Sequence, residues 1–126
     1  MAGLVETAIR SKISSGQLLK TPDIHKSASF EVERLDTEGM VLLFGKKKTP
    51  TKISWQCLEG IPAFLKGKDW VEVGTVYYTS ANPGTLDEYL KGWINRGTAG
   101  WVASVLEKVG IVEIDRNRPI RVRLKQ

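Results

Sequence analysis

A three-residue segment, Asn95-Arg96-Gly97, separates two stretches whose apolar residues recur at helical spacing. The first stretch begins with a capping-box pattern, Thr85 and Glu88, and the second runs from 98 to 109 and is followed by Gly110. Threonine and glutamate at this spacing satisfy free backbone N–H groups at a helix start, and glycine accepts the left-handed conformation that ends a helix. The pattern predicts two consecutive helices joined by a tight turn, with Thr98 as the cap of the second.

Strand-like and helical patterns flank this pair. Residues 111–115 and 120–125 are expected to form two strands around the turn 116–119, and in the second strand apolar and basic residues alternate. Upstream, residues 54–65 predict a helix capped by Ser54, with a break or kink because Gly60 and Pro62 lie in its middle. Residues 70–78 have a strand-like content.

The N-terminal part predicts one helix and one hairpin. Residues 4–15 have apolar positions at helical spacing, and Gly16 is placed to end that helix. Residues 29–35 and 40–44 have the composition of strands, and Gly39 can supply the turn between them. The lysine-rich stretch 45–52 is expected to lie in an exposed turn.

From residue 54 onward this order of elements resembles a winged helix-turn-helix domain. The resemblance implies that the helix from Thr85 is the first of the pair, that 98–109 is the recognition helix, and that 111–125 is the wing. The expected fold is α+β, with an N-terminal helix and β-hairpin packed with a C-terminal winged helix-turn-helix unit. We expect one compact domain over 1–126, with subregions 1–53 and 54–126.

The basic residues are concentrated in two segments. The chain has 126 residues, with 19 basic and 14 acidic residues and a net charge of +5. Residues 45–52 contain four lysines, residues 116–126 contain five basic groups, and neither segment contains an acid. Without these nine cations, ten basic and fourteen acidic groups remain, a net charge of −4. Such polarity is typical of a protein that contacts a polyanion.

The resemblance implies that the recognition helix enters the DNA major groove and that the wing touches the backbone or the minor groove. Helical geometry predicts that Gly100, Ser104, Glu107 and Lys108 lie on the outer face, with Trp101 at its edge. This face has no arginine for guanine and no asparagine or glutamine for adenine, so we expect contacts mainly to phosphates. The candidate nucleic-acid-binding residues are Lys46, Lys47, Lys48, Arg96, Trp101, Ser104, Lys108, Arg116, Arg118, Arg121, Arg123 and Lys125.

No motif predicts catalysis. Gly45-Lys46 lacks the upstream glycine and the following hydroxyl residue of a phosphate-binding loop. His25 is the only histidine, and Cys57 is expected to be a small filler of a helix face. We therefore expect no enzyme activity, no cofactor and no metal.

The leading hypothesis is a non-catalytic protein that binds double-stranded DNA through phosphates. The alternative is a protein-protein interaction module or homodimeric adaptor that uses an apolar patch near Trp55, Trp70 or Trp101. A third possibility is a binder of single strands or RNA that stacks bases on Trp101 or on Tyr77 and Tyr78. The arginines of the last strand also have an explanation without a ligand, since charge on an edge strand prevents aggregation. No apolar run is long enough to cross a membrane, so a cytoplasmic location is expected.

Overall fold

The computed structural model describes residues 3–22, 28–44, 49–74, 84–94, 98–117 and 119–125, with the backbone alone described for Phe44 and Thr49. The fold is α+β, as predicted, because it contains helices and two antiparallel sheets. Its elements are α1 (Leu4–Lys12), β1 (Gln17–Lys20), β2 (Ser29–Leu35), β3 (Gly39–Phe44), β4 (Thr49–Ser54), α2 (Trp55–Leu65), β5 (Val71–Glu72), α3 (Leu86–Lys91), α4 (Ala99–Lys108), β6 (Val112–Asp115) and β7 (Arg121–Leu124).

The N-terminal sheet, called sheet A here, has four antiparallel strands in the order β1-β2-β3-β4. The predicted β2–β3 hairpin is present, but the sheet is twice as large as the two strands expected from the sequence. β4 occupies part of the stretch interpreted as an exposed lysine-rich turn, so that interpretation is wrong for residues 49–52. Pro50 is compatible with β4 because this strand lies at the edge of the sheet, where a missing N–H donor is tolerated.

Helix α2 runs from Trp55 to Leu65, so the predicted break at Gly60 and Pro62 is not found. Pro62 removes the hydrogen bond that residue 62 would donate, and its effect is confined to the last part of the helix, which ends at Leu65. The predicted cap is confirmed, because the hydroxyl of Ser54 accepts a hydrogen bond from the backbone N–H of Cys57 at 3.1 Å.

The predicted cap of α3 is also confirmed, because Thr85 Oγ1 accepts the backbone N–H of Glu88 at 3.1 Å. The helix ends at Lys91, three residues earlier than expected. Trp93 therefore lies beyond the helix and is 48% exposed, although its spacing predicts a core position.

Thr98 is the N-cap residue of α4, as predicted, but its side chain makes no capping hydrogen bond. The helix is followed, as predicted, by Gly110 in the left-handed conformation (φ +83°). Helix α1 ends at Lys12 rather than near Gly16, and Gly16 (φ +85°) instead lies just before β1.

The C-terminal sheet, called sheet B here, has three antiparallel strands in the order β5-β7-β6. The arginine-bearing strand β7 is thus its central strand and not an edge strand. Protection of an exposed edge therefore does not explain the arginines of β7.

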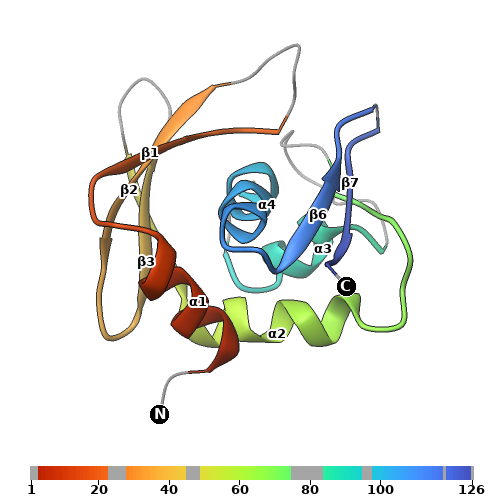
Figure 1. The fold of residues 1–126 in the computed structure, drawn as a ribbon, viewed down its shortest axis with the longest axis horizontal. Helices are drawn as coiled ribbons and strands as arrows, with labels where there is room; N and C mark the ends of the chain where they lie inside the picture. The colour runs from red at the N-terminus through yellow and green to blue at the C-terminus, as the bar shows by residue number, and fades with distance from the viewer. Residues whose placement is uncertain are drawn as a thin grey trace.

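Figure 1 shows α4 at the centre of the molecule, with sheet A on one side and sheet B on the other. Six of its residues are buried: Ala99, Val102, Ala103, Ser104, Val105 and Leu106. Buried side chains from both the N-terminal and the C-terminal elements form one cluster around it. Within the described residues, no helix is long and apolar enough to cross a membrane.

Candidate nucleic-acid interface

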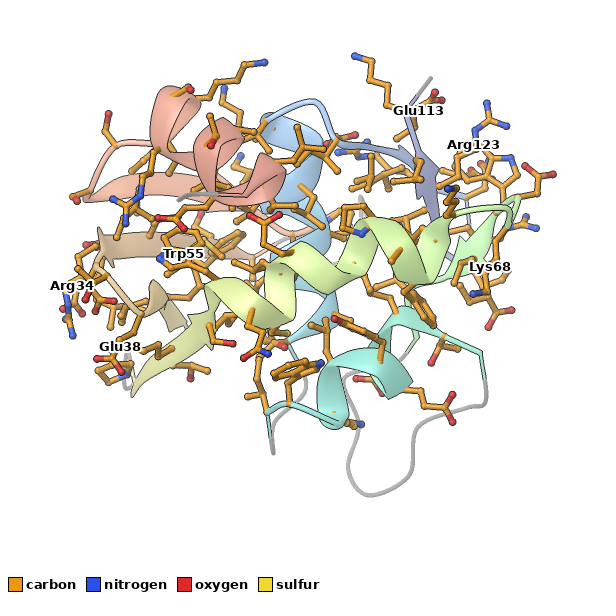
Figure 2. All side chains as sticks on the ribbon, turned by 90° about the horizontal axis from the view of Figure 1, so that it is seen from below. Arg34, Glu38, Trp55, Lys68, Glu113 and Arg123 are labelled. Atoms are coloured by element: carbon orange, nitrogen blue, oxygen red, sulfur yellow. The ribbon has the colours of Figure 1, made fainter. Side chains whose placement is uncertain are left out.

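The outer face of sheet B carries the two arginines of β7. Val122 is fully buried, so the alternation of the strand turns Arg121 and Arg123 to the opposite face, as predicted. The guanidinium of Arg123 lies 4.3 Å from the ring centre of Trp70 and pairs with Asp69 and Glu113, each at 3.4 Å. Figure 2 shows Arg123 beside Glu113 at one end of the molecule. The indole ring of Trp70 and the two carboxylates therefore hold Arg123 in place.

Arg121 is flanked in the same way. Its guanidinium lies 3.7 Å from the carboxylate of Asp115 on β6, and Glu72 on β5 is its register partner on the other side. Each arginine of β7 thus lies among acidic side chains of the neighbouring strands or of the residues before β5. The two arginines lie among four carboxylates, so the outer face of sheet B is not basic.

Arg116, which follows β6 in the β6–β7 hairpin, also forms an ion pair. Arg116 donates to both carboxylate oxygens of Glu107, at 2.7 and 2.6 Å. This two-point contact raises the pKa of Arg116, because Glu107 favours the charged form. Lys108 and Lys125 are exposed, and within the described residues neither has a carboxylate at ion-pair distance.

Helix α4 does not present the face expected of a recognition helix. Ser104, predicted on the outer face, is only 6% exposed, and Trp101 is half-buried. Residues of the N-terminal subregion cover this side: Lys12 Nζ donates to the carbonyl of Val109 at 3.4 Å, and Pro22 Cδ lies 3.8 Å from where a Cβ on Gly100 would be. The prediction that Ser104 faces outward is wrong, because sheet A and α1 pack against the helix.

Five predicted contact residues, namely Lys46, Lys47, Lys48, Arg96 and Arg118, lie outside the described residues. Together with Lys26, they make six of the nineteen basic residues, whereas Asp23 is the single acidic residue outside the described ranges. Thirteen basic and thirteen acidic residues remain in the described part. The described part is therefore neutral in formal charge, and the net +5 belongs to the other segments.

The residues that flank three of these segments meet at one end of sheet A. In an antiparallel meander, the β1–β2 and β3–β4 connections leave from the same end, so Pro22, Ala28, Leu43 and Pro50 lie there. The start of α4 joins them, since Pro22 lies against Gly100. We call this the open end of sheet A.

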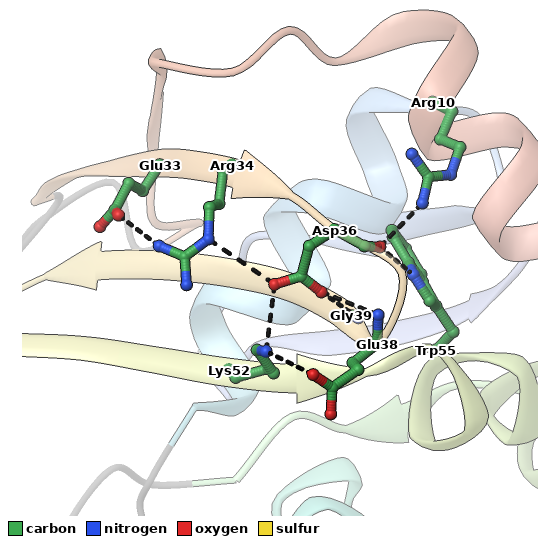
Figure 3. Close-up of polar contacts among 8 residues, drawn as sticks. All are labelled: Arg10, Glu33, Arg34, Asp36, Glu38, Gly39, Lys52 and Trp55. Carbon is green, nitrogen blue, oxygen red and sulfur yellow. Dashed lines mark hydrogen bonds and ion pairs between the residues drawn. The ribbon is translucent and has the colours of Figure 1, made fainter.

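At the opposite end of sheet A, Asp36 follows β2 and connects it to β3 and β4 (Figure 3). Its carboxylate accepts the backbone N–H groups of Glu38 and Gly39 at 2.8 and 2.9 Å, and it lies 3.0 Å from Lys52 Nζ. These contacts lower the pKa of Asp36 to about 2. The N–H of Glu38 has the largest effect, Lys52 the next largest, and the N–H of Gly39 a smaller one. Lys52, counted with the basic segment 45–52, is thus paired and belongs to a structural cluster that sequence reasoning missed.

The tryptophans differ from the predicted apolar patch. Trp55 is buried and donates its indole N–H to the carbonyl of Asp36 at 2.8 Å, so it is unavailable to a partner. Trp70 and Trp101 are half-buried, while the exposed tryptophan is Trp93, which the predicted patch does not include. The interaction-module hypothesis stays a prediction, as does base stacking on Trp101. Tyr77 and Tyr78 lie outside the described residues.

Within the described part of the chain, no group of three or more His, Cys, Asp and Glu side chains is arranged to hold a metal ion. Cys57 is fully buried, and burial raises the pKa of its thiol to about 12. A thiol in this setting stays protonated and fills space, as expected. No protein-family model, curated protein or solved structure matches the chain.

Proposed function

We propose that the protein binds double-stranded DNA without catalysing a reaction, through backbone phosphates and without reading base sequence. The observation that carries the proposal is the location of the charge. The described residues are balanced, and five of the six other cations belong to segments flanked by residues at the open end of sheet A. These three segments together carry five cations and one acidic residue, and such an excess of positive charge favours a polyanion as the ligand. The proposal includes a cytoplasmic location.

The order α2-β5-α3-α4-β6-β7 and the sheet order β5-β7-β6 support the resemblance to a winged helix-turn-helix domain. The resemblance favours the same class of ligand, double-stranded DNA. It implies contact through a recognition helix in the major groove, whereas the proposal relies on contacts to phosphates. Sheet A and α1 cover α4, so this helix has no free face for the major groove. Arg121 and Arg123 are paired with carboxylates and would have to exchange these partners for phosphates. The principal contacts are therefore assigned to Lys46, Lys47 and Lys48, and the β6–β7 hairpin contributes less.

A salt titration tests this proposal. The affinity for a fluorescent duplex of about 20 base pairs is measured by anisotropy between about 50 and 300 mM salt, and each phosphate contact contributes about −0.9 to the slope of log affinity against log salt. The variant Lys46→Ala/Lys47→Ala/Lys48→Ala should reduce the magnitude of the slope by about 2 to 3. Arg121→Ala/Arg123→Ala should change it by less than about 1, and a duplex of scrambled sequence should bind equally well.

A matched control separates local contacts from net charge. Lys66 and Lys68 are exposed beyond the end of α2, and Lys66→Ala/Lys68→Ala lowers the net charge by two without touching the open end of sheet A. This variant should leave the slope nearly unchanged. Absence of binding at about 50 mM salt would refute DNA binding. An equal loss of slope in the control would refute the assignment to the open end.

A further inference from the structure

In the part of the chain that the structure describes, strand β1 is an edge strand of sheet A. Among the described strands it pairs only with β2, and α4 packs against it from the inner face of the sheet. In the middle of this strand, Leu18 is 66% exposed, and Lys20 at its end is exposed too. An edge strand that carries an exposed leucine offers a surface that another strand can cover.

The backbone of β1 also has groups directed outward. The N–H of Thr21 donates to the carbonyl of Ala28 at 2.9 Å, and the same register pairs Leu19 with Phe30 and Gln17 with Val32. In an antiparallel ladder, hydrogen-bonded pairs alternate with pairs that do not bond to each other. The N–H and C=O groups of Leu18 and Lys20 therefore point away from β2, toward the free edge.

We propose that this edge pairs with β1 of a second copy of the chain, antiparallel and centred on Leu19. Opposed residues in an antiparallel pair share a face, so Leu18 must oppose a residue that also points to the outer face. With Leu19 on the two-fold axis, Leu18 opposes Lys20 of the second copy, and Lys20 opposes Leu18. This register joins all the outward backbone groups of Leu18 and Lys20 in four hydrogen bonds.

The side chains support a second copy as the occupant. On the outer face, the methylene stem of Lys20 covers Leu18 of the other chain, beside which lies Glu31, the register partner of Leu18 on β2. Within the described residues, neither Lys20 nor Glu31 has an ion-pair partner, so the ammonium and the carboxylate are available to each other across the axis. On the inner face, Leu19, which already packs against the core, meets its own copy. The edge is thus complementary to itself.

The contact is small, because β1 has four residues. Stable dimers bury more than about 1,000 Å² in total, and a pairing of this length buries less, so self-association is expected only at high concentration. The measurement is sedimentation velocity without DNA, from about 5 to 500 μM chain. The average mass should rise with concentration from 14.0 kDa toward twice that value.

Charge at position 18 gives the sharpest test of the register. Leu18→Lys places two lysines opposite each other on both sides of the axis and should weaken the dimer about tenfold or more. Leu18→Glu places a carboxylate opposite Lys20 and should weaken it much less. The double variant Leu18→Lys/Lys20→Glu should restore association. Leu4, the first residue of α1, is 71% exposed and does not belong to sheet A, so Leu4→Lys is the matched control and should leave the dimer intact.

Two outcomes would overturn the proposal. A wild-type chain that stays monomeric over the whole concentration range would exclude a second copy as the occupant of this edge. A dimer equally sensitive to Leu18→Lys and Leu18→Glu, or insensitive to both, would exclude the register. Circular dichroism of each variant reports whether the fold is kept. Lys20→Glu, an exposed substitution that leaves Leu18 in place, tests the same contact if Leu18→Lys does not fold.

Discussion

The carboxylate of Glu59 on α2 caps helix α1 by accepting a hydrogen bond from the backbone N–H of Val5 at 3.0 Å. Its second oxygen accepts the N–H of Glu6 at 2.8 Å. The helix has no cap of its own, because residue 3 is glycine. A side chain more than fifty residues away thus supplies what Ser, Thr, Asp or Asn supplies in most helices.

Removing this cap should destabilise the fold. Glu59→Ala leaves the first N–H groups of α1 without acceptors and is expected to cost about 1 to 2 kcal/mol in urea unfolding. Gln56→Ala, an exposed change on the same helix, should cost less than about 0.5 kcal/mol. A Cβ on Gly3 would meet the carboxyl of Glu59 at less than normal contact distance. Gly3→Ala should therefore be costly in the wild type and nearly neutral with Glu59→Ala, and equal costs in both backgrounds would contradict the cap.

The carboxylate of Asp36 should make stability depend on pH. Its pKa is about 2 in the fold, against an ordinary value of 3.8. A lowered pKa stabilises the fold above pH 3.8, and the contribution is lost as the pH falls from 3.8 toward 2. The melting temperature of Asp36→Asn should lie below that of the wild type at pH 7, and the gap should close in this acidic range. A gap that persists unchanged at pH 2 would show that the charge of Asp36 is not its cause.

Gly60 and Tyr89 should show strong coupling. The hydroxyl of Tyr89 donates to the carbonyl of Cys57 at 2.7 Å and occupies the space in which a Cβ on Gly60 would lie. Gly60→Ala should therefore cost about 1 to 2 kcal/mol, although alanine is the better helix residue. With Tyr89→Phe the nearest ring atom is 3.4 Å away, so the same change should become neutral or stabilising. Additive effects in this double-mutant cycle would disprove the contact.

The burial of Ser104 distinguishes a covered helix α4 from an exposed one. Its hydroxyl has no hydrogen-bond partner within the described residues, so Ser104→Ala should leave stability unchanged or raise it by up to about 1 kcal/mol. Ser104→Arg must place a charge between α4 and its neighbours and should cost about 3 kcal/mol or more. Lys108→Ala, on an exposed position of the same helix, is the control and should change little. Toleration of arginine at 104 would mean that this side of α4 is open.

Elements specified by local signals could be predicted from the sequence. The cap at Thr85, the cap at Ser54 and the left-handed Gly110 all act on their own helix, and all are found in the structure. The strands β1 and β4 have no comparable signal. β1 has only four residues, and β4 contains Pro50 and Lys52, which are typical of turns. Both exist because they extend a sheet begun by β2 and β3.

The pairing and burial of the candidate site residues could not be predicted, because they depend on contacts between residues far apart in the sequence. Arg123 was counted as a free cation, but its partner Asp69 lies 54 residues away in the chain. Ser104 was placed outside by helical geometry, which says which residues share a face but not what packs on it. The excess charge could be read from the sequence. Which of the basic side chains pair with carboxylates in the fold could not.

The central position of α4 determines how the chain can be cut. A fragment beginning at residue 54 would keep the helix pair and sheet B, yet the side of α4 that meets β1 and α1 would lose its cover. In the intact chain, the backbone amide protons of α4 should exchange with solvent more slowly than those of the other elements. Exposing them requires both sheets to separate from the helix. We therefore expect residues 1–53 and 54–126 to unfold together, and we expect neither part to keep its fold when it is transferred alone.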